Sequence, residues 1–294
     1  MKKKKTLLIF DGSNCLRRGF HAVPEMTTSK GFHTNAIKGL INIVVSVCKR
    51  TSPTHIAFVM DRNAKTHRHE IYAEYKGTRQ KDPDVIERLT PQRKPMYDLL
   101  TAMGIKVFHK RGVEADDIIG TLTRKAVAKG WNVIIISNDK DFAQLLEEGV
   151  ELWKYLNHLR DYLVINADNC EEVFGVPHTR IIDKLMMEGD SVDNIPGVKG
   201  IGPAALKKLI ATHKRIEKAD LTVLSKAQRT SFEGARKQFK LTRELVTINC
   251  DVMPVKLTDS LPQPPDTKLI YLICKALEAP VIQRTIQTYI DNRT

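Results

Sequence analysis

The sequence predicts an α/β protein with a doubly wound, mainly parallel sheet, followed by a helical region. Short apolar, β-branched runs without polar alternation recur up to about residue 137, as expected for strands that are covered on both faces. Helical patterns separate these runs, and such alternation is typical of a parallel sheet. After residue 175 the pattern becomes helical. We therefore expect a domain over residues 1–175 and a second over residues 176–294.

Four runs are expected to form parallel strands, and a weaker fifth run completes the sheet. Helical patterns cover residues 36–49 and 116–129, and Gly130 ends the second of them. The predicted strands are residues 6–10, 55–60, 105–108, 132–137 and 162–165, and the predicted later helices are residues 180–188, 204–213 and 234–248.

Residues 62–95 interrupt the alternation with a long polar insertion. Insertions of this length are more often functional than bare connections, and this one should overhang the edge of the sheet. Basic side chains interleaved with Tyr72 and Tyr75 suit single-stranded nucleic acid. An exposed amphipathic helix with a solvated charged face is the alternative. The basic residues are Arg62, Lys65, Arg68, Lys76, Arg79, Lys81, Arg88, Arg93 and Lys94.

Nine carboxylates stand where a predicted strand or helix begins or ends. Parallel strands bring their carboxyl ends to one edge of a sheet, where such folds bind ligands. This many negative charges need cations between them, and oxygen-only ligands suit Mg²⁺ or Mn²⁺. The nine are Asp11, Asp61, Glu114, Asp116, Asp117, Asp139, Asp141, Asp190 and Asp193.

The overall charge points to a polyanionic partner. The net charge is +13 and the isoelectric point is near 9.5, so a basic body surrounds the acidic positions. Scattered surface acids on a basic protein are the alternative. No apolar run reaches membrane-spanning length, and no signal-peptide core follows the first lysines, so an intracellular protein is expected. Five widely spaced cysteines without a CxxC pair argue against a disulfide framework and a zinc site.

The segment GVKGIG precedes a helix that Pro203 opens. Glycines there expose backbone N–H groups and a helix N-terminus, which can hold a phosphate, although a tight turn between helices uses the same residues. Its position directly after GDSVDN favours a clamp on a phosphate backbone. The residues of this clamp are Gly197, Lys199, Gly200, Gly202, Lys207 and Lys208.

The acidic positions favour metal-assisted hydrolysis. Two divalent ions about 4 Å apart can support phosphodiester displacement without a nucleophilic side chain. The sequence has no GxSxG, and no Cys or His stands in a recognisable catalytic setting. An aspartyl-phosphate phosphatase would need a second Asp two residues after Asp11, where Ser13 stands instead.

Six ordered motifs resemble those of the 5′-nuclease, or flap endonuclease, family. The similarity extends from residue 6 to about residue 250 and is greatest to the amino-terminal 5′-3′ exonuclease domain of bacterial DNA polymerase I and its free-standing bacterial and phage relatives. The motifs are LLIFDGSN, FVMDR, EYKGTR, GVEADDIIGTL, ISNDKDFAQLL and MEGDSVDNIPGVKGIG.

The resemblance implies a PIN-like α/β domain with a helical arch at about residues 62–97, and a carboxyl-terminal helix-two-turn-helix region. Lys76 and Arg79 match basic residues that steer or stabilise the scissile phosphate, and Arg68 matches an arch residue that faces it. Tyr75 matches an aromatic residue on which the terminal nucleotide stacks. GVKGIG matches a loop that grips duplex DNA, with K⁺ on its carbonyls. One implied metal group is Asp11, Asp61, Glu114 and Asp116, the other is Asp139, Asp141, Asp190 and Asp193, and Asp117 is implied to act through water.

We therefore expect a structure-specific 5′-nuclease, acting as a 5′-3′ exonuclease and flap endonuclease with two metal ions in DNA replication or repair. Its expected substrates are DNA with 5′ flaps or 5′ ends and RNA primers on DNA. A monomer in the cytoplasm of a bacterium, or of a host if a phage encodes it, is expected, with any replicative polymerase acting in trans. A PIN-type ribonuclease and a catalytically weak DNA-junction binding protein are the alternatives.

Overall fold

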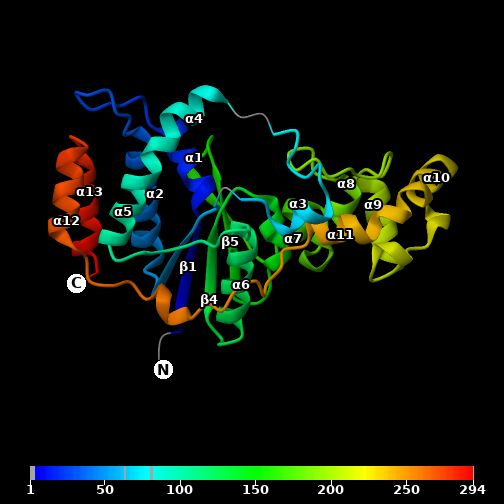
Figure 1. Ribbon diagram of the computed structural model, residues 1–294. Coiled ribbons are helices and arrows are strands. Elements are labelled where there is room, and N and C mark those ends of the chain that lie inside the picture. Colours follow the sequence, from blue (N-terminus) through cyan, green and yellow to red (C-terminus); the bar gives the residue numbers. More distant parts are fainter. Residues whose placement is uncertain (1–3, 63, 80–81, 294) are drawn as a thin grey trace.

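The computed structural model places one sheet between layers of helices, with a helical lobe beside it (Figure 1). The structure describes residues 4–62, 64–79 and 82–293. The strand order is β3-β2-β1-β4-β5-β6, and every pair is parallel except β5 with β6. The strands are β1 (Thr6–Asp11), β2 (His55–Val59), β3 (Lys106–Phe108), β4 (Asn132–Ile136), β5 (Val150–Leu156) and β6 (Asp161–Ile165).

The prediction of a mainly parallel sheet with helices on both faces is confirmed. Alternate residues of β1 enter two separate apolar cores: Leu7 and Ile9 lie in one, and Leu8 and Phe10 lie in the other. Strands covered on both faces have no solvent side, so they need no polar alternation. The sequence reasoning missed β5. Its segment VELWKYL does alternate apolar and polar residues, which is a strand signal.

The first core holds one face of the sheet against α6 (Ala115–Val127) and the helical lobe. The second holds the other face against α1 (Gly12–Ala22), α2 (Asn35–Thr51) and α5 (Arg93–Ala102). Gly130 ends the α6 segment as predicted, with a positive φ of 70°. The described residues also form short 3-10 helices, some of them in the helical lobe: η1 (Thr90–Gln92), η2 (Lys140–Leu145), η3 (His178–Arg180), η4 (Ile216–Lys218), η5 (Leu221–Val223), η6 (Arg236–Gln238) and η7 (Leu257–Ser260).

The described parts of the basic insertion lie beside the helical lobe and on the α1 side of the sheet (Figure 1). It contains α3 (His67–Ile71) and α4 (Pro83–Leu89), and its last residues enter η1 and α5. At the lobe end, Arg68 donates to the Leu245 carbonyl. At the other end, Arg88 donates to Glu25 and lies over the Phe20 ring of α1. Lys81 of the predicted basic set lies outside the described residues.

The helical lobe shares its apolar core with the α6 face of the sheet. The expected single helix over residues 234–248 is wrong, because two α-helices separated by η6 cover that stretch. The α-helices of the lobe are α7 (Cys170–Phe174), α8 (Ile181–Glu188), α9 (Pro203–Thr212), α10 (Lys226–Ala235) and α11 (Phe239–Val246).

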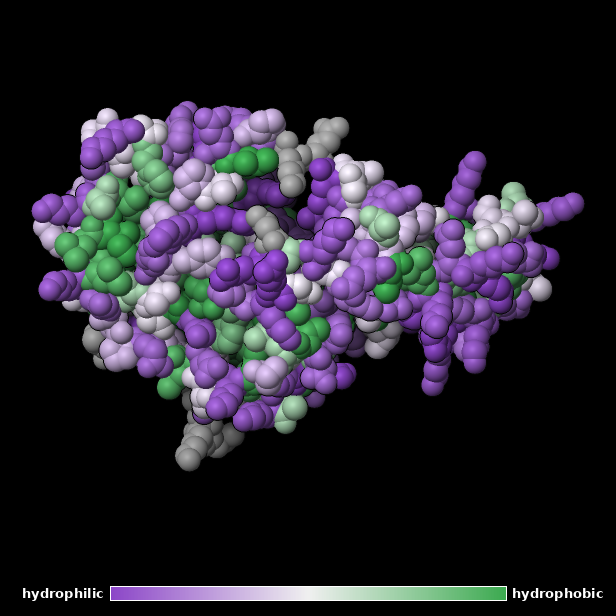
Figure 2. All heavy atoms as spheres, in the orientation of Figure 1, coloured by the Kyte–Doolittle hydropathy of each residue, from purple (hydrophilic) through white to green (hydrophobic). Residues whose placement is uncertain are grey.

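The last two helices do not belong to this lobe. Helices α12 (Thr267–Ala276) and α13 (Pro280–Asp291) pack on α5 and α2 at the opposite end of the molecule (Figure 1). The predicted second domain over residues 176–294 therefore ends too late: residues beyond about 266 complete the first domain. Apolar side chains also gather on the exposed face of this pair (Figure 2). They include Leu269, Tyr271, Leu272 and Val281.

The cysteines and the lengths of the helices bear on two further expectations from the sequence. All five cysteines are free, and only Cys250 is more than marginally accessible. Among the described residues, no helix has both the length and the apolar character that a membrane span needs.

The close crossing of α1 and α2 yields a stability test. A Cβ atom at Gly39 would lie 2.3 Å from the Gly19 carbonyl oxygen. Gly39→Ala should therefore lower the free energy of unfolding by about 2 kcal/mol, because the helices must move apart. Gly234→Ala is the matched control: its Cβ would meet nothing within 4 Å. It should raise that free energy by about 0.5–1 kcal/mol. Urea denaturation measures both, and equal effects would contradict the close packing.

Candidate active site at the carboxyl edge of the sheet

Two of the predicted acids are positioned by the ends of β1 and β2. Asp11 is the last residue of β1 and caps α1, accepting a hydrogen bond from the Asn14 N–H at 3.2 Å. Ser137, directly after β4, donates its hydroxyl to Asp11 at 2.7 Å. Asp61 follows β2 and accepts from the Ala115 N–H at 2.9 Å. Asp61 therefore holds the start of α6, which carries Glu114, Asp116 and Asp117.

The first acidic set consists of Asp11, Asp61, Glu114 and Asp116. Burial, together with the charges of Asp61 and Asp139, raises the pKa of Asp11 from its ordinary value to about 6. Burial also raises the pKa of Asp116 well above its ordinary value, and the charges of Asp11, Asp139 and Asp61 add to the effect. The charges of these carboxylates therefore act on one another.

The second acidic set consists of Asp139, Asp141, Asp190 and Asp193. Asp139 caps η2 and accepts from the Asp141 N–H at 2.9 Å, and Asp190 accepts from the Asp193 N–H at 3.1 Å. Burial and the neighbouring Asp139 raise the pKa of Asp141 to about 7. Burial raises the pKa of Asp139 as well, with contributions from Asp193 and Asp190. The two sets are adjacent, since the Lys76 ammonium lies 3.0 Å from a Glu114 oxygen of the first set and 3.9 Å from an Asp193 oxygen of the second.

The chemistry of both sets fits hard divalent cations. The predicted ligands carry only oxygen donors, and ionised carboxylates that repel one another are stabilised when a cation lies between them. In the part of the chain that the structure describes, no three Asp, Glu, His or Cys side chains are already grouped as around one ion. The assignment of metal ligands therefore rests on donor chemistry and on convergence at one edge.

Arg68 differs from its predicted place facing a phosphate. Its guanidinium is buried and binds both carboxylate oxygens of Asp117, at 2.8 and 2.9 Å. It also donates to Glu114 at 3.1 Å and to the carbonyls of Leu245 and Thr247. Asp117 is thus engaged by a cation and by the Asn249 N–H, which favours a structural role over metal binding.

Lys76 and Arg79 lie where the two acidic sets meet. The Lys76 ammonium is 3.0 Å from a Glu114 oxygen and 3.9 Å from an Asp193 oxygen. Arg79 donates to Asp193 and to the Val192 carbonyl. The Lys76 backbone has a φ of 57°, a conformation that non-glycine residues rarely adopt. The Lys76 N–H donates to the Asp193 carbonyl at 3.0 Å, which holds this turn in place.

Tyr75 also differs from its prediction as a stacking platform. The residue is only 4% exposed, and its ring lies in the apolar core below the turn. The hydroxyl points toward Glu114 and Asp193. A nucleobase has no access to the buried ring in this conformation.

The glycine-rich loop lies directly after the second acidic set. A Cβ atom at Gly197 would be 2.3 Å from the Glu188 carbonyl oxygen, so only glycine allows this approach to α8. Gly200 has a φ of 82°, and its carbonyl accepts from the Gln228 side chain of α10 at 3.0 Å. Gly202 caps α9, and the ammonium groups of this region are exposed. They belong to Lys199, Lys207 and Lys208.

Hydroxyl groups that support the acids were missed by the sequence reasoning. Besides Ser137, Ser13 donates to Asp61 at 3.0 Å and Thr66 donates to Glu114 at 3.2 Å. Each fixes the orientation of a carboxylate. Ser13 and Ser137 directly adjoin acidic motifs, so their positions in the sequence carried a usable signal.

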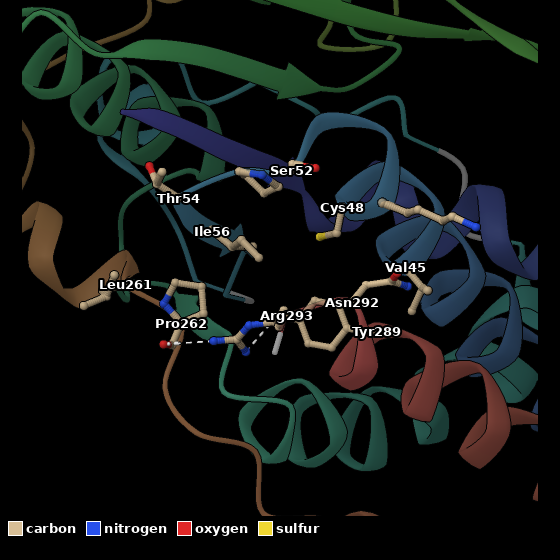
Figure 3. Close-up of a pocket in the computed structure, with 12 residues that line it drawn as sticks. Val45, Cys48, Ser52, Thr54, Ile56, Leu261, Pro262, Tyr289, Asn292 and Arg293 are labelled. Atoms are coloured by element: carbon tan, nitrogen blue, oxygen red, sulfur yellow. Dashed lines mark hydrogen bonds between the residues drawn. The ribbon is translucent and has the colours of Figure 1, made fainter. Parts of the chain in front are cut away.

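A separate pocket of about 380 Å³ lies at the opposite edge of the sheet (Figure 3). It is lined by the end of α2, the residues before and at the start of β2, and the end of α13, including Cys48, Thr54 and Tyr289. None of the predicted site residues lines this pocket. The carboxyl edge of the sheet therefore remains the candidate active site.

The chain belongs to the 5′-3′ exonuclease family. The N-terminal resolvase-like domain of that family matches residues 6–175, and its C-terminal SAM fold matches residues 176–268.

Individual relatives agree with this assignment. A 5′-3′ exonuclease of Aquifex aeolicus is 37% identical over 248 residues, covering 84% of this chain and 83% of that protein. The DNA polymerase I of Pseudomonas aeruginosa is 35% identical over 284 residues. That match covers 92% of this chain and 30% of the polymerase, so the chain spans less than a third of that relative.

Solved structures share the fold. T5 5′-exonuclease with bound zinc ions aligns with a TM-score of 0.69 and 20% identity, covering 98% of this chain and 99% of that one. Human GEN1 in complex with Holliday junction DNA aligns with a TM-score of 0.65 and 13% identity, covering 97% of this chain and 71% of that one.

The raised pKa values of the buried acids predict how pH affects stability without metal. Asp11 and Asp141 keep protons to about pH 6 and 7 in the folded state, whereas their ordinary value is 3.8. Between these limits the folded protein binds more protons than the unfolded chain, so its stability falls as pH rises. In chelator, the contribution of these acids should lower the melting temperature between pH 5 and pH 8.

Asp11→Asn is the control, because it removes the ionisation while its amide oxygen can still accept from the Asn14 N–H and its amide nitrogen can donate to the Ser137 hydroxyl. Its melting temperature should fall less over the same pH range than that of the unaltered protein. An equal fall in both proteins would contradict the assignment of the pH dependence to Asp11.

Proposed function

We propose that this chain is a divalent-metal-dependent, structure-specific 5′-nuclease that hydrolyses phosphodiester bonds near junctions between single-stranded and duplex DNA. The observation that carries the proposal is the position of Lys76 and Arg79 at the meeting point of two acidic sets. Cations at this point can bind a phosphate that approaches carboxylates which would otherwise repel it.

The proposed ions are two Mg²⁺ or Mn²⁺, held by the two acidic sets described above. When bound, these ions supply the electrophilic assistance that phosphodiester hydrolysis requires. The chain's own residues orient the substrate: Lys76 and Arg79 bind the phosphate at the cleavage position, and their positive charge stabilises the charge that develops there. The acids are oriented by Ser13, Thr66 and Ser137.

Duplex DNA is proposed to bind along the glycine-rich loop and α9. Backbone N–H groups at the start of a helix bind phosphate, and the exposed Lys199, Lys207 and Lys208 add positive charge. The carbonyl groups of the loop are the proposed site of K⁺. Single-stranded DNA is proposed to approach the site beside the basic insertion, whose described parts lie near the lobe and near α1 (Figure 1).

RNA primers on DNA are included among the proposed substrates, and a monomer in the cytoplasm is the proposed working form. A replicative polymerase is the proposed partner, since the polymerase I relatives carry their matching region within a longer chain. The relatives solved with DNA support a DNA junction over RNA as the substrate.

A labelled 5′-flap duplex tests the proposal. Cleavage near the junction should require Mg²⁺ or Mn²⁺ and stop with excess chelator, because carboxylates alone provide no electrophile. A single-stranded RNA of the flap sequence serves as the comparison. Cleavage in chelator would reject the metal mechanism, and preferential cleavage of RNA would favour a PIN-type ribonuclease.

Lys76→Ala should reduce the single-turnover cleavage rate roughly a hundredfold, or about 3 kcal/mol, with a much smaller change in flap affinity. The fold should persist, because Arg68 still pairs with Glu114. Lys94→Ala is the control: Lys94 belongs to the same basic insertion and makes an exposed pair with Asp98. If the cleavage rate of Lys76→Ala lay within threefold of the Lys94→Ala rate, Lys76 would be a solvated surface charge without a specific role in cleavage.

Replacing Lys207 and Lys208 with Ala should lower the slope of log affinity against log salt by about 2, at roughly 0.9 per phosphate contact. Replacing Lys268 and Lys275 on α12 removes the same charge at the opposite end of the molecule and should leave the slope unchanged. The measurement is flap binding in Ca²⁺ across a salt series. Equal slopes for the two double variants would place the duplex elsewhere.

A further inference from the structure

The Tyr75 hydroxyl lies between carboxylates of the two acidic sets. It is 3.1 Å from a Glu114 oxygen and 2.9 Å from an Asp193 oxygen. Glu114 directly precedes α6, the helix that packs on the sheet. Asp193 belongs to the GDSVDN loop (residues 189–194), which leads into the glycine-rich loop. One hydroxyl therefore contacts two distant parts of the chain.

The backbone holds this hydroxyl in place from both sides. The Lys76 N–H donates to the Asp193 carbonyl, and the Asn194 side chain donates to the Glu74 carbonyl at 2.9 Å. The Tyr75 ring packs edge-on against His69, with 5.2 Å between centroids. The turn around Tyr75 and the GDSVDN loop are thus joined by several contacts, with the phenol at their centre.

The charges around the phenol explain how two carboxylates approach one hydroxyl. The Tyr75 hydroxyl has a single proton, and both carboxylates lie within hydrogen-bond distance of it. That proton can be donated to either carboxylate. Arg68 and Lys76 pair with Glu114, and Arg79 pairs with Asp193, which offsets the repulsion between the two acids.

We propose that Tyr75 is a positioning residue whose hydroxyl joins Glu114 to Asp193 and thereby sets the spacing of the two acidic sets. The inference rests on the proposed function, because it concerns the same acidic site. It replaces the stacking role, since the ring is buried. Groups that orient metal-binding carboxylates typically change ion affinity or activity by 10–100-fold when removed.

Tyr75→Phe tests the proposal, because it removes the hydroxyl and keeps the buried ring. Tyr72→Phe is the matched control: Tyr72 lies three residues earlier, and its hydroxyl donates only to the exposed Glu74 among the described residues. Mn²⁺ affinity without DNA, measured by electron paramagnetic resonance, should fall about tenfold in Tyr75→Phe. It should stay unchanged in Tyr72→Phe. Flap affinity in Ca²⁺ should stay within about twofold of the unaltered protein, since phosphate contacts supply most of that affinity.

A double-mutant cycle with Asp193→Asn keeps the test decisive. If the hydroxyl acts through Asp193, then adding Tyr75→Phe to Asp193→Asn should lower Mn²⁺ affinity far less than Tyr75→Phe does alone. Melting temperatures in chelator report whether each variant folds. Unchanged Mn²⁺ affinity in folded Tyr75→Phe would overturn the proposal. Flap affinity that is kept in Tyr75→Phe but lost in folded Tyr75→Ala, with normal Mn²⁺ binding in both, would support stacking instead.

The ion-affinity measurement is independent of cleavage. If the unaltered protein binds Mn²⁺ but cuts no flap, the proposed nuclease function fails. A fall of Mn²⁺ affinity in Tyr75→Phe would still support the bridge between Glu114 and Asp193.

Discussion

The guanidinium of Arg68 holds together three parts of the chain on which the candidate site depends. It comes from α3, binds Asp117 and Glu114 at the start of α6, and donates to two carbonyls at and after the end of α11. A buried carboxylate that loses its cation is costly, typically about 3–5 kcal/mol, because its hydration is not restored. The insertion, the sheet and the helical lobe therefore share one buried electrostatic contact.

The acids of the site divide into two kinds according to their partners. Glu114, Asp117, Asp190 and Asp193 each pair with an Arg or Lys. Among the described residues, Asp11, Asp116, Asp139 and Asp141 have no Lys or Arg within 4 Å, and their pKa values are raised. Protein cations thus neutralise the acids next to the insertion and leave Asp11, Asp116, Asp139 and Asp141 for other positive charge. A basic body with this unneutralised acidic centre suits a site where ions and a phosphate backbone meet.

The two apolar cores explain how the helical lobe is attached to the sheet that carries the candidate site. One core extends from the α6 face of the sheet into α8, α9 and α11, so the glycine-rich loop is mounted on the same apolar layer as Asp11 and Asp139. The other core is closed by α12 and α13 against α2 and α5. Figure 1 shows these two layers on opposite sides of the sheet.

Local sequence determined the parallel sheet, the convergence of the acids and the glycine-rich loop, because strand ends and tight turns depend on neighbouring residues. The apolar runs before Asp11, Asp61 and Asp139 place those carboxylates at strand ends, and parallel pairing brings these ends to one edge of the sheet. Tertiary structure alone decided the partners of Arg68 and Tyr75, since each contact joins residues far apart in sequence. It also decided that α12 and α13 return to the first domain, because an amphipathic helix does not specify which apolar surface it will cover.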